Sequence, residues 1–252
     1  MNRKYGWVRD LADRRDFTYM PRMVKRYPSS ASLKDKQPPI WDQGQLASCT
    51  GFGCKRVAMY GMFKVKQRLD ISALFIYWCE RALENTTGSD GGAMIRDGIK
   101  ALAQWGVCEE KLWPYRIGRY AMQPPDKAFK NALRFQALQY ERVNNATPDQ
   151  IKNAILSDLP VVFGMSIYES FETAAVAKTG IVPMPSGAEK MLGGHAMCIV
   201  GYDDCVSGCG IGCFQVANSW GTSWGKKGYC YIPYDYLCSA QASDFWAITK
   251  ME

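Results

Sequence analysis

The chain has a single histidine, His195, among its 252 residues, so any imidazole-dependent reaction must use that side chain. Long apolar runs are also missing: none approaches the roughly twenty residues that a membrane-spanning helix needs, which excludes a transmembrane segment. The N-terminal stretch lacks the apolar core and the small-residue cleavage site of a secretory signal. We therefore expect a cytoplasmic protein with no membrane partner.

A concentrated basic patch is missing too. The 31 lysines and arginines outnumber the 24 acidic residues, giving a net charge of +7, but they are scattered and form no run with interleaved aromatics. We therefore expect no nucleic-acid partner. With 47% apolar and 22% charged residues, the composition is that of a globular protein with a sizeable core. We expect it to be a monomer.

Ten cysteines are present, and three of them lie four residues apart in a glycine-rich loop: Cys205, Cys209 and Cys213. This spacing is not the Cys-x-x-Cys of a zinc knuckle, and no histidine is nearby in sequence to complete a metal site. We favour loop thiols, with one reversible disulfide to Cys230 or Cys238, over a bound metal. Metal analysis of the purified protein would decide between them. We expect no metal and no cofactor.

The stretch from Gln43 to Phe52 contains the candidate nucleophile. Cys49 follows a turn that contains glycine and serine, and it precedes a helix-compatible segment, residues 52–66. The positive end of a helix dipole favours the thiolate, which is the reactive form of cysteine. Gln43 lies upstream and offers an amide that can donate to a developing oxyanion, beside the backbone N–H of Cys49. Alone, this pattern also fits a small buried cysteine.

His195 lies in a run, residues 193–202, that is typical of a strand entered through flexible glycines. A further motif, residues 216–225, contains Asn218. The amide of Asn218 can hold an imidazole in one tautomer. With Cys49 and His195 it would complete a set of nucleophile, base and orienting group.

Three motifs occur in a fixed order along the chain: Gln-Gly-x-x-x-Ser-Cys, Gly-His-Ala and Asn-Ser-Trp-Gly-x-x-Trp-Gly-x-x-Gly-Tyr. The chain thereby resembles the papain family of cysteine peptidases, including its wide cysteine-to-histidine separation. Here 195 − 49 gives 146 residues, and 218 − 195 places the asparagine 23 residues later. The resemblance covers roughly residue 38 to the C-terminus, and the short segment before it is similar to a short-propeptide microbial branch of the family.

The resemblance implies an α+β fold of papain type, with a helical left half, an antiparallel β-barrel-like right half, and the active-site cleft between them. We expect residues 38–145 to form the helical half with the nucleophile and residues 146–252 to form the β half with histidine and asparagine. The implied activity is that of a cysteine endopeptidase that hydrolyses peptide or protein substrates through a thioester. The expected catalytic residues are Cys49, His195, Asn218 and Gln43, as nucleophile, general acid and base, orienting group and oxyanion donor.

By the same resemblance, the pair Gly91-Gly92 matches backbone that pairs with an extended substrate, and a plain turn is the alternative. Trp220 is expected to shield the hydrogen bond between Asn218 and His195 from water, with simple core packing as the alternative. The expected substrate-binding residues are Gly91, Gly92, Ala93, Met94, Gly194, Ala196, Trp220 and Ser243.

Two departures from the family pattern have consequences. Thr50 follows the nucleophile where the family usually has tryptophan, which predicts a cleft wall that is altered and wetter. Leu46 and Ala47 replace the usual Cys-Gly, so the disulfide of secreted relatives cannot form. Together with the missing export signal, this favours a reducing compartment.

Residues 1–37 form a basic head that contains several aromatic side chains. It is much shorter than the helical propeptides of papain-like zymogens. Three roles remain open for it: a solvated tail, a strap packed on the body, or a short inhibitor that lies over the cleft. Because exposed aromatic side chains tend to be buried somewhere, we favour the strap.

Two other activities fit the same residues. An acyltransferase would pass the identical thioester to an amine acceptor, which product analysis with added amines would show. A peptide-binding pseudoenzyme would have lost turnover, although a pure binder does not need all four catalytic groups together.

Overall fold

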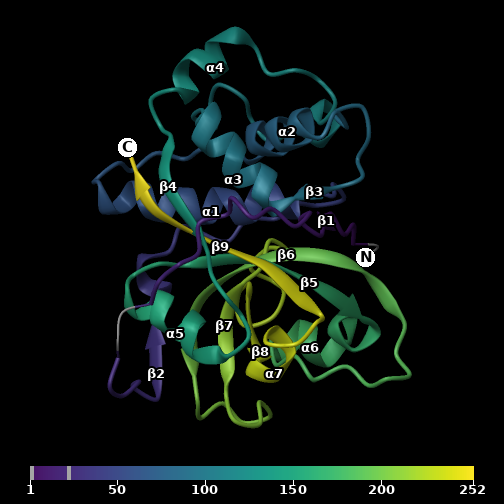
Figure 1. Cartoon of the computed structure of the whole chain (residues 1–252). Coiled ribbons are helices and arrows are strands. Elements are labelled where there is room, and N and C mark those ends of the chain that lie inside the picture. The colour runs from purple at the N-terminus through teal and green to yellow at the C-terminus, as the bar shows by residue number, and fades with distance from the viewer. Residues whose placement is uncertain (1–2, 22–23) are drawn as a thin grey trace.

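The computed structural model describes residues 3–21 and 24–252, and it shows a helical region packed against a β-sheet region (Figure 1). The predicted head, residues 1–37, therefore contains residues 1–2 and 22–23, which lie outside the described part of the chain. The helical region lies above the sheet in Figure 1, and the purple N-terminal chain passes between the two.

Helix α1 is the centre of the helical region and is buried along almost its whole length, because it packs against two other helices and the sheet. Helix α2 begins after Ser72, whose hydroxyl accepts a hydrogen bond from the backbone N–H of Phe75 at 3.0 Å. The helices of this region are α1 (Cys49–Lys64), α2 (Ala73–Leu83), α3 (Ile95–Gln104), α4 (Asp126–Ala132) and the 3₁₀ turn η2 (Ile117–Arg119).

The main sheet has the strand order β4-β9-β5-β6-β7-β8, with β2 beside β6, and these pairs are antiparallel. Its strands are β2 (Ser30–Ser32), β4 (Ala137–Arg142), β5 (Val161–Tyr168), β6 (Met191–Asp203), β7 (Cys213–Ala217), β8 (Tyr229–Pro233) and β9 (Ala242–Met251). Short helices border it: η1 (Lys34–Lys36), α5 (Pro148–Leu156), η3 (Glu169–Glu172), α6 (Ala174–Thr179) and α7 (Tyr234–Leu237). This arrangement confirms the expected α+β fold of papain type.

Strand β4 lies within residues 38–145, the range expected to form the helical half. Of its six residues only Ala137 is buried, so the strand has no alternating apolar pattern that a sequence reading could detect. Its antiparallel pairing with β9 fixes its conformation instead. The division of the chain at residue 145 stays a prediction. In the described part of the chain, no helix has the length and apolar character needed to cross a membrane.

Two apolar clusters form the core, one in the helical region and one in the sheet region. Strand β9 contributes to both, because consecutive side chains of a strand point to opposite faces: Trp246 packs in the first cluster and Phe245 in the second. Cys49 belongs to the first cluster and Trp220 to the second. The candidate nucleophile and the tryptophan expected to shield the histidine therefore belong to different clusters.

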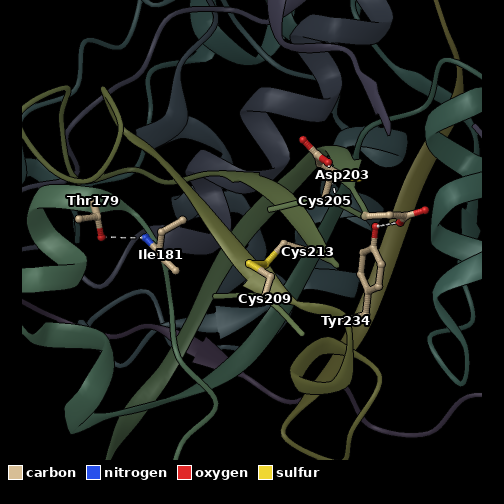
Figure 2. The surroundings of a disulfide bond; sticks show 8 residues. Thr179, Ile181, Asp203, Cys205, Cys209, Cys213 and Tyr234 are labelled. Atoms are coloured by element: carbon tan, nitrogen blue, oxygen red, sulfur yellow. Dashed lines mark hydrogen bonds between the residues drawn. A yellow bond between two sulfur atoms is a disulfide. The ribbon is translucent and has the colours of Figure 1, made fainter. Parts of the chain in front are cut away.

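The glycine-rich loop before β7 contains a disulfide between Cys209 and Cys213, with their Cα atoms 5.5 Å apart (Figure 2). The expected bridge to Cys230 or Cys238 is wrong, since both are free. Strand register explains why: Cys230 lies opposite Val216, whereas Cys213 lies opposite the far end of β8. Within residues 3–21 and 24–252, no group of three or more histidine, cysteine or acidic side chains is placed to hold a metal ion.

The described part of the head is packed along the body rather than free in solvent. The Tyr19 hydroxyl donates to Asn153 Oδ1 at 2.9 Å, and the Tyr19 side chain is buried. Thr18 forms a parallel bridge with Arg142 at the end of β4. Phe17, in contrast, is 75% exposed, so the expected burial of the head aromatics does not hold for that side chain. These contacts support the strap among the three open roles.

Candidate active site

Cys49 is the first residue of α1, in the place that the preceding turn predicts. Its thiol is completely buried, and the backbone of Ala196 and of Gly6 hydrogen-bonds to it. Burial raises the pKa of the Cys49 thiol to about 12, and hydrogen bonds from the backbone of Ala196, Gly6 and Thr50 oppose this only in part. Burial thus opposes the thiolate in this state of the chain, and the expected thiolate stays a prediction.

His195 lies on β6, opposite Met165 of β5, and is completely buried. The Asn218 side-chain oxygen accepts the Ser219 backbone N–H at 2.7 Å, so His195 Nε2, which is 2.8 Å away, donates to the same oxygen. The ring proton is then on Nε2. The other nitrogen, Nδ1, has no hydrogen-bond partner within the described residues and keeps its lone pair. Burial lowers the pKa of His195 to about 4, against the effect of the Asn218 bond.

The Gln43 side chain is held in one orientation. Its oxygen accepts the Ser219 hydroxyl at 2.6 Å, and its Nε2 donates to the Leu46 carbonyl at 2.8 Å. The second N–H of the amide is directed at the Lys4 carbonyl of the head, with Nε2 and the oxygen 3.3 Å apart. Gln43 therefore presents one fixed N–H donor to a carbonyl oxygen inside the site, which is the arrangement that an oxyanion donor needs.

Trp220 lies over the histidine, with the two ring centroids 4.9 Å apart and the planes tilted by 30°. Phe171 and Trp224 pack against its other sides. The guanidinium of Arg3, from the head, is 5.1 Å from the Trp220 ring centre. This placement suits shielding of the histidine from water and core packing equally, and one does not exclude the other.

The head lies along the expected substrate-binding backbone. Strand β1 (Trp7–Val8) pairs in parallel with β3 (Ala93–Met94), and the Ala93 N–H donates to the Gly6 carbonyl at 2.8 Å. A Cβ atom added to Gly92 would be 2.1 Å from that same carbonyl oxygen. Glycine is therefore required at this position for a peptide to approach the backbone so closely.

The Trp7 side chain fills a pocket formed by two glycines and an aspartate. A Cβ atom on Gly164 would be 2.0 Å from the indole ring, and one on Gly194 would be 2.5 Å from the Trp7 carbonyl oxygen. At the end of the pocket, Trp7 Nε1 donates to Asp244 Oδ2 at 3.0 Å. Ser243 lies beside this aspartate on β9, and its hydroxyl is buried with no partner in the described structure.

Not all of the expected substrate-binding residues meet the head. Gly91 is exposed, and a Cβ atom added to it would have only the Ser89 hydroxyl nearby, at 3.6 Å. Of the expected glycine pair, only Gly92 is therefore in contact with the segment that occupies the cleft. The expected residues that contact the head directly, or pair with it, are Gly92, Ala93, Met94, Gly194 and Trp220.

A family model described as papain family cysteine protease matches residues 27–247. The chain belongs to the papain family of cysteine proteases. This papain-family protease is 36% identical to the uncharacterized peptidase C1-like protein L477 of Acanthamoeba polyphaga mimivirus, over all of this chain and 88% of that protein. Its structure matches that of xylellain, a cysteine protease from Xylella fastidiosa, with a TM-score of 0.90, 34% identity, and coverage of 100% of this chain and 99% of the other.

A more distant relative is chymopapain of Carica papaya, which is 26% identical over 86% of this chain. The chain spans 57% of that relative's length. These comparisons establish a cysteine peptidase, and the similarity to xylellain agrees with the short-headed microbial branch expected from the sequence.

In this papain-family protease, Thr50, the residue after Cys49, is closed off from solvent, which is contrary to the expected wetter cleft wall. Thr50 is completely buried, and its hydroxyl donates to Glu80 Oε1 at 2.5 Å. Glu80 is completely buried as well, and burial raises the pKa of its carboxyl well above the ordinary range. The charge of Glu80, where present, also raises the pKa of the Cys49 thiol.

Two residues of the site had not been identified from the sequence. Gly164 makes room for the Trp7 indole, and a glycine inside a strand is itself a signal that another group approaches closely. Ser219 holds the Gln43 amide in place from 176 positions further along the chain. No local pattern could have paired these two side chains, because the contact exists only after the helical and sheet regions meet.

Proposed function

We propose that this protease is an endopeptidase in which Cys49 is the nucleophile and His195 the general acid and base. The observation that carries the proposal is the bond between His195 Nε2 and Asn218 Oδ1 at 2.8 Å, which leaves the Nδ1 lone pair free. The Cys49 thiol is hydrogen-bonded by the backbone of Ala196, the residue that follows this histidine. These contacts support the assignment of Cys49, His195 and Asn218 as nucleophile, base and orienting group.

The proposed reaction begins when a substrate replaces the head. The Cys49 proton moves to His195 Nδ1, and the sulfur attacks the carbonyl carbon, forming a C–S bond and an oxyanion. Gln43 Nε2–H and the Cys49 backbone N–H bind that oxyanion, each good donor contributing about 3–4 kcal/mol. The C–N bond then breaks while Nδ1–H protonates the leaving amine. Water, deprotonated by Nδ1, attacks the thioester, and the released sulfur takes the proton back.

Labelling with a thiol-directed epoxysuccinyl inhibitor tests this assignment. We expect one equivalent of label on Cys49 in the chain once its head is displaced, none in Cys49→Ala, and strongly slowed labelling in His195→Ala, because the imidazole generates the attacking thiolate. Cys54→Ala is the matched control, since that thiol is also buried in α1. A peptide-binding pseudoenzyme would bind peptides but would not acquire the label, and that result would exclude the proposal.

We further propose that residues 3–8 inhibit the enzyme to which they belong. The Lys4 carbonyl occupies the position in front of Gln43 Nε2, while the Cys49 thiol is hydrogen-bonded by Gly6, two residues further along. Tyr5 lies between them, with its ring 6.0 Å from that of His195. The Lys4 carbonyl thus fills the oxyanion position, whereas the sulfur contacts a different residue, Gly6. The head therefore blocks the site, and its Lys4 carbonyl carbon is not positioned for attack by the sulfur.

The strength of this inhibition should depend on pH through Asp10. Burial, and then the nearby charge of Asp244, raise the pKa of Asp10 from 3.8 to about 6, although Arg142, the Arg96 backbone and Trp246 oppose this. A raised pKa in the docked state means that docking is strongest below about pH 4 and weakens as the pH rises through about 6, by up to about tenfold per pH unit.

Asp10→Asn removes this titration, so the turnover of wild type divided by that of Asp10→Asn should fall towards its low-pH limit as the pH drops from about 6 to about 4. The measurement is hydrolysis of a small fluorogenic peptide amide by both chains across that range. The protonation of Cys49 and His195 also changes with pH, but it affects both chains equally and therefore cancels in the ratio of turnovers. A ratio that does not vary with pH would show that Asp10 does not couple head docking to protons.

A further inference from the structure

Beyond the cleft, the acidic side chains of the head meet basic side chains of the body. Asp16 Oδ2 lies 2.8 Å from Arg96 Nη2 and 3.1 Å from Arg142 Nε. Asp13 Oδ2 lies 3.9 Å from Lys100 Nζ. The head thus places carboxylates three residues apart against a group of three body cations, which we call the cation cluster: Arg96, Lys100 and Arg142.

The cation cluster belongs to two fixed elements of the body. Arg96 and Lys100 are one turn apart on the same face of α3, and Arg142 is the last residue of β4. Arg96 is buried beneath the head. Among the described residues, Asp16 is the carboxylate with which it forms an ion pair. If the head leaves, Arg96 therefore loses its carboxylate partner and gains access to solvent.

The body carboxylates do not neutralise this cluster. Asp244 Oδ1 lies 3.5 Å from Arg142 Nη1. Burial raises the pKa of Asp97 while the charges of Lys100 and Arg96 oppose this, so two body carboxylates interact with the three cations. Asp10 of the head is also bound to Arg142, at 3.0 Å, but it crowds Asp244. A displaced head therefore leaves an excess of one positive charge, 3 − 2, on this part of the body.

The position of the cluster relates it to the substrate. Because His195 must protonate the leaving amine, the C-terminal part of a substrate lies on the side of His195 and Trp220. The N-terminal part then runs past Ala93 towards the Trp7 pocket. That pocket ends at Asp244, which also contacts Arg142 of the cluster. The cluster therefore lies further along the path of the N-terminal part of the substrate.

The body also offers backbone for an extended chain at this place. The Arg142 N–H donates to the Phe17 carbonyl at 2.7 Å, and the Tyr19 N–H donates to the Arg142 carbonyl at 2.8 Å. The head thus adds to the open edge of β4 as a short parallel strand. A substrate segment can use the same two backbone groups, since strand addition needs no particular side chains.

We propose that the cation cluster is a second substrate-binding site, which takes acidic side chains in the segment N-terminal to the scissile bond once the head has left. The assignment rests on the proposed peptidase function and on displacement of the head. Asp13 and Asp16 of the head occupy the site in the inhibited chain. The substrate class is therefore an extended polypeptide with aspartate or glutamate beginning several residues before the bond that is cleaved.

A binding experiment on the full chain tests the site without relying on turnover. The probes are a fluorescein-labelled peptide with three aspartates, each separated by two residues, and its asparagine twin. The binding variant is Cys49→Ala with Trp7→Ala added to the double head variant, Asp13→Asn and Asp16→Asn. In it we expect the aspartate peptide to bind about tenfold tighter than its twin at about 0.05 M salt, and this preference to shrink at about 0.5 M salt. The parent Cys49→Ala chain should show little preference, because its own head occupies the site.

Charge-matched variants locate the effect. Adding Arg96→Gln and Lys100→Gln should abolish the preference, whereas Lys127→Gln and Lys130→Gln, on the exposed face of α4, should leave it unchanged. Equal affinity for the two peptides, or equal loss with the α4 pair, would overturn the proposal. If Arg96→Gln unfolds the chain, because Arg96 is buried, Lys100→Gln alone serves in the same head variant, since Lys100 is half-exposed: a preference that it does not reduce would contradict the site.

A kinetic experiment separates this proposal from the peptidase assignment. With Trp7→Ala added to the double head variant and Cys49 restored, kcat/KM should be about tenfold higher for a substrate with upstream aspartates than for its asparagine twin. A short substrate that ends before the cluster should be cleaved equally well with or without Arg96→Gln and Lys100→Gln. If the chain binds the aspartate peptide preferentially but hydrolyses neither substrate, the peptidase assignment is refuted and the site for acidic side chains is retained. If it hydrolyses both substrates equally well, the peptidase assignment is retained and the site for acidic side chains is refuted.

Discussion

Replacing Trp7 by alanine in the full chain should raise the turnover of a small fluorogenic peptide amide by about a hundredfold. The indole is the largest head side chain in the cleft, where it packs on Gly164 and donates to Asp244. Deleting a fully buried aromatic side chain costs about 3–5 kcal/mol, and Trp7 is partly buried, so we take a value just below this range. Since only chains with a displaced head bind substrate, turnover rises in proportion to their population.

Phe17→Ala is the matched control for this prediction. Phe17 is also an aromatic residue of the head, but it is 75% exposed and lies away from the cleft, so turnover should not change. If Trp7→Ala leaves turnover as it was, while the parent chain already hydrolyses the substrate readily, the head does not limit access to Cys49. A rise that Phe17→Ala reproduces would point to general loosening of the strap instead.

A point substitution tests inhibition more cleanly than removal of residues 1–37. Within that range, Tyr19 and Leu33 are buried in the sheet-side core, and Ser30–Ser32 form β2 beside β6. Deleting the whole segment would therefore remove core contacts and a strand together with the part that fills the cleft. A loss of activity in such a deletion would report on stability as much as on inhibition.

Candidate catalytic residues could be proposed from the sequence because the chemistry restricts the choice of residues. A chain with one histidine has one candidate base, and Asn218 and Gln43 then follow from motifs in a known order. The strands around His195 and Asn218 could also be predicted from their apolar runs and glycine turns. Strand β4 could not, since pairing with a distant strand rather than local pattern sets its conformation.

The state of the site depends on contacts that no local pattern contains. The sequence favours a thiolate at Cys49 through the helix dipole, but burial of the folded site opposes it, and the Gly6 backbone that bonds to the thiol comes from a segment more than forty positions away. Buried in this way, the thiol and His195 have pKa values of about 12 and about 4, so the neutral pair prevails between them. The same two residues can form the reactive pair only when the head is displaced and water returns.

His195→Ala should lower kcat by about 10⁴-fold or more when measured in the Trp7→Ala background, where the head no longer masks the site. Without the imidazole, nothing in the site accepts the Cys49 proton or protonates the leaving amine. Asn218→Ala should cost less, because the ring remains present and loses only the bond at 2.8 Å that fixes its tautomer.

Gln43→Ala is the reference for the kcat losses of these two variants. It removes one oxyanion donor, which should lower kcat by about 10²- to 10³-fold, while the thiol can still be activated. Steady-state kinetics with one peptide amide substrate would rank the three variants. The rate of thiol alkylation separates the roles further: it should fall in His195→Ala and persist in Gln43→Ala. A His195→Ala chain that retains more activity than Gln43→Ala would mean that another group serves as the base. The proposed mechanism would then be wrong at its first proton transfer.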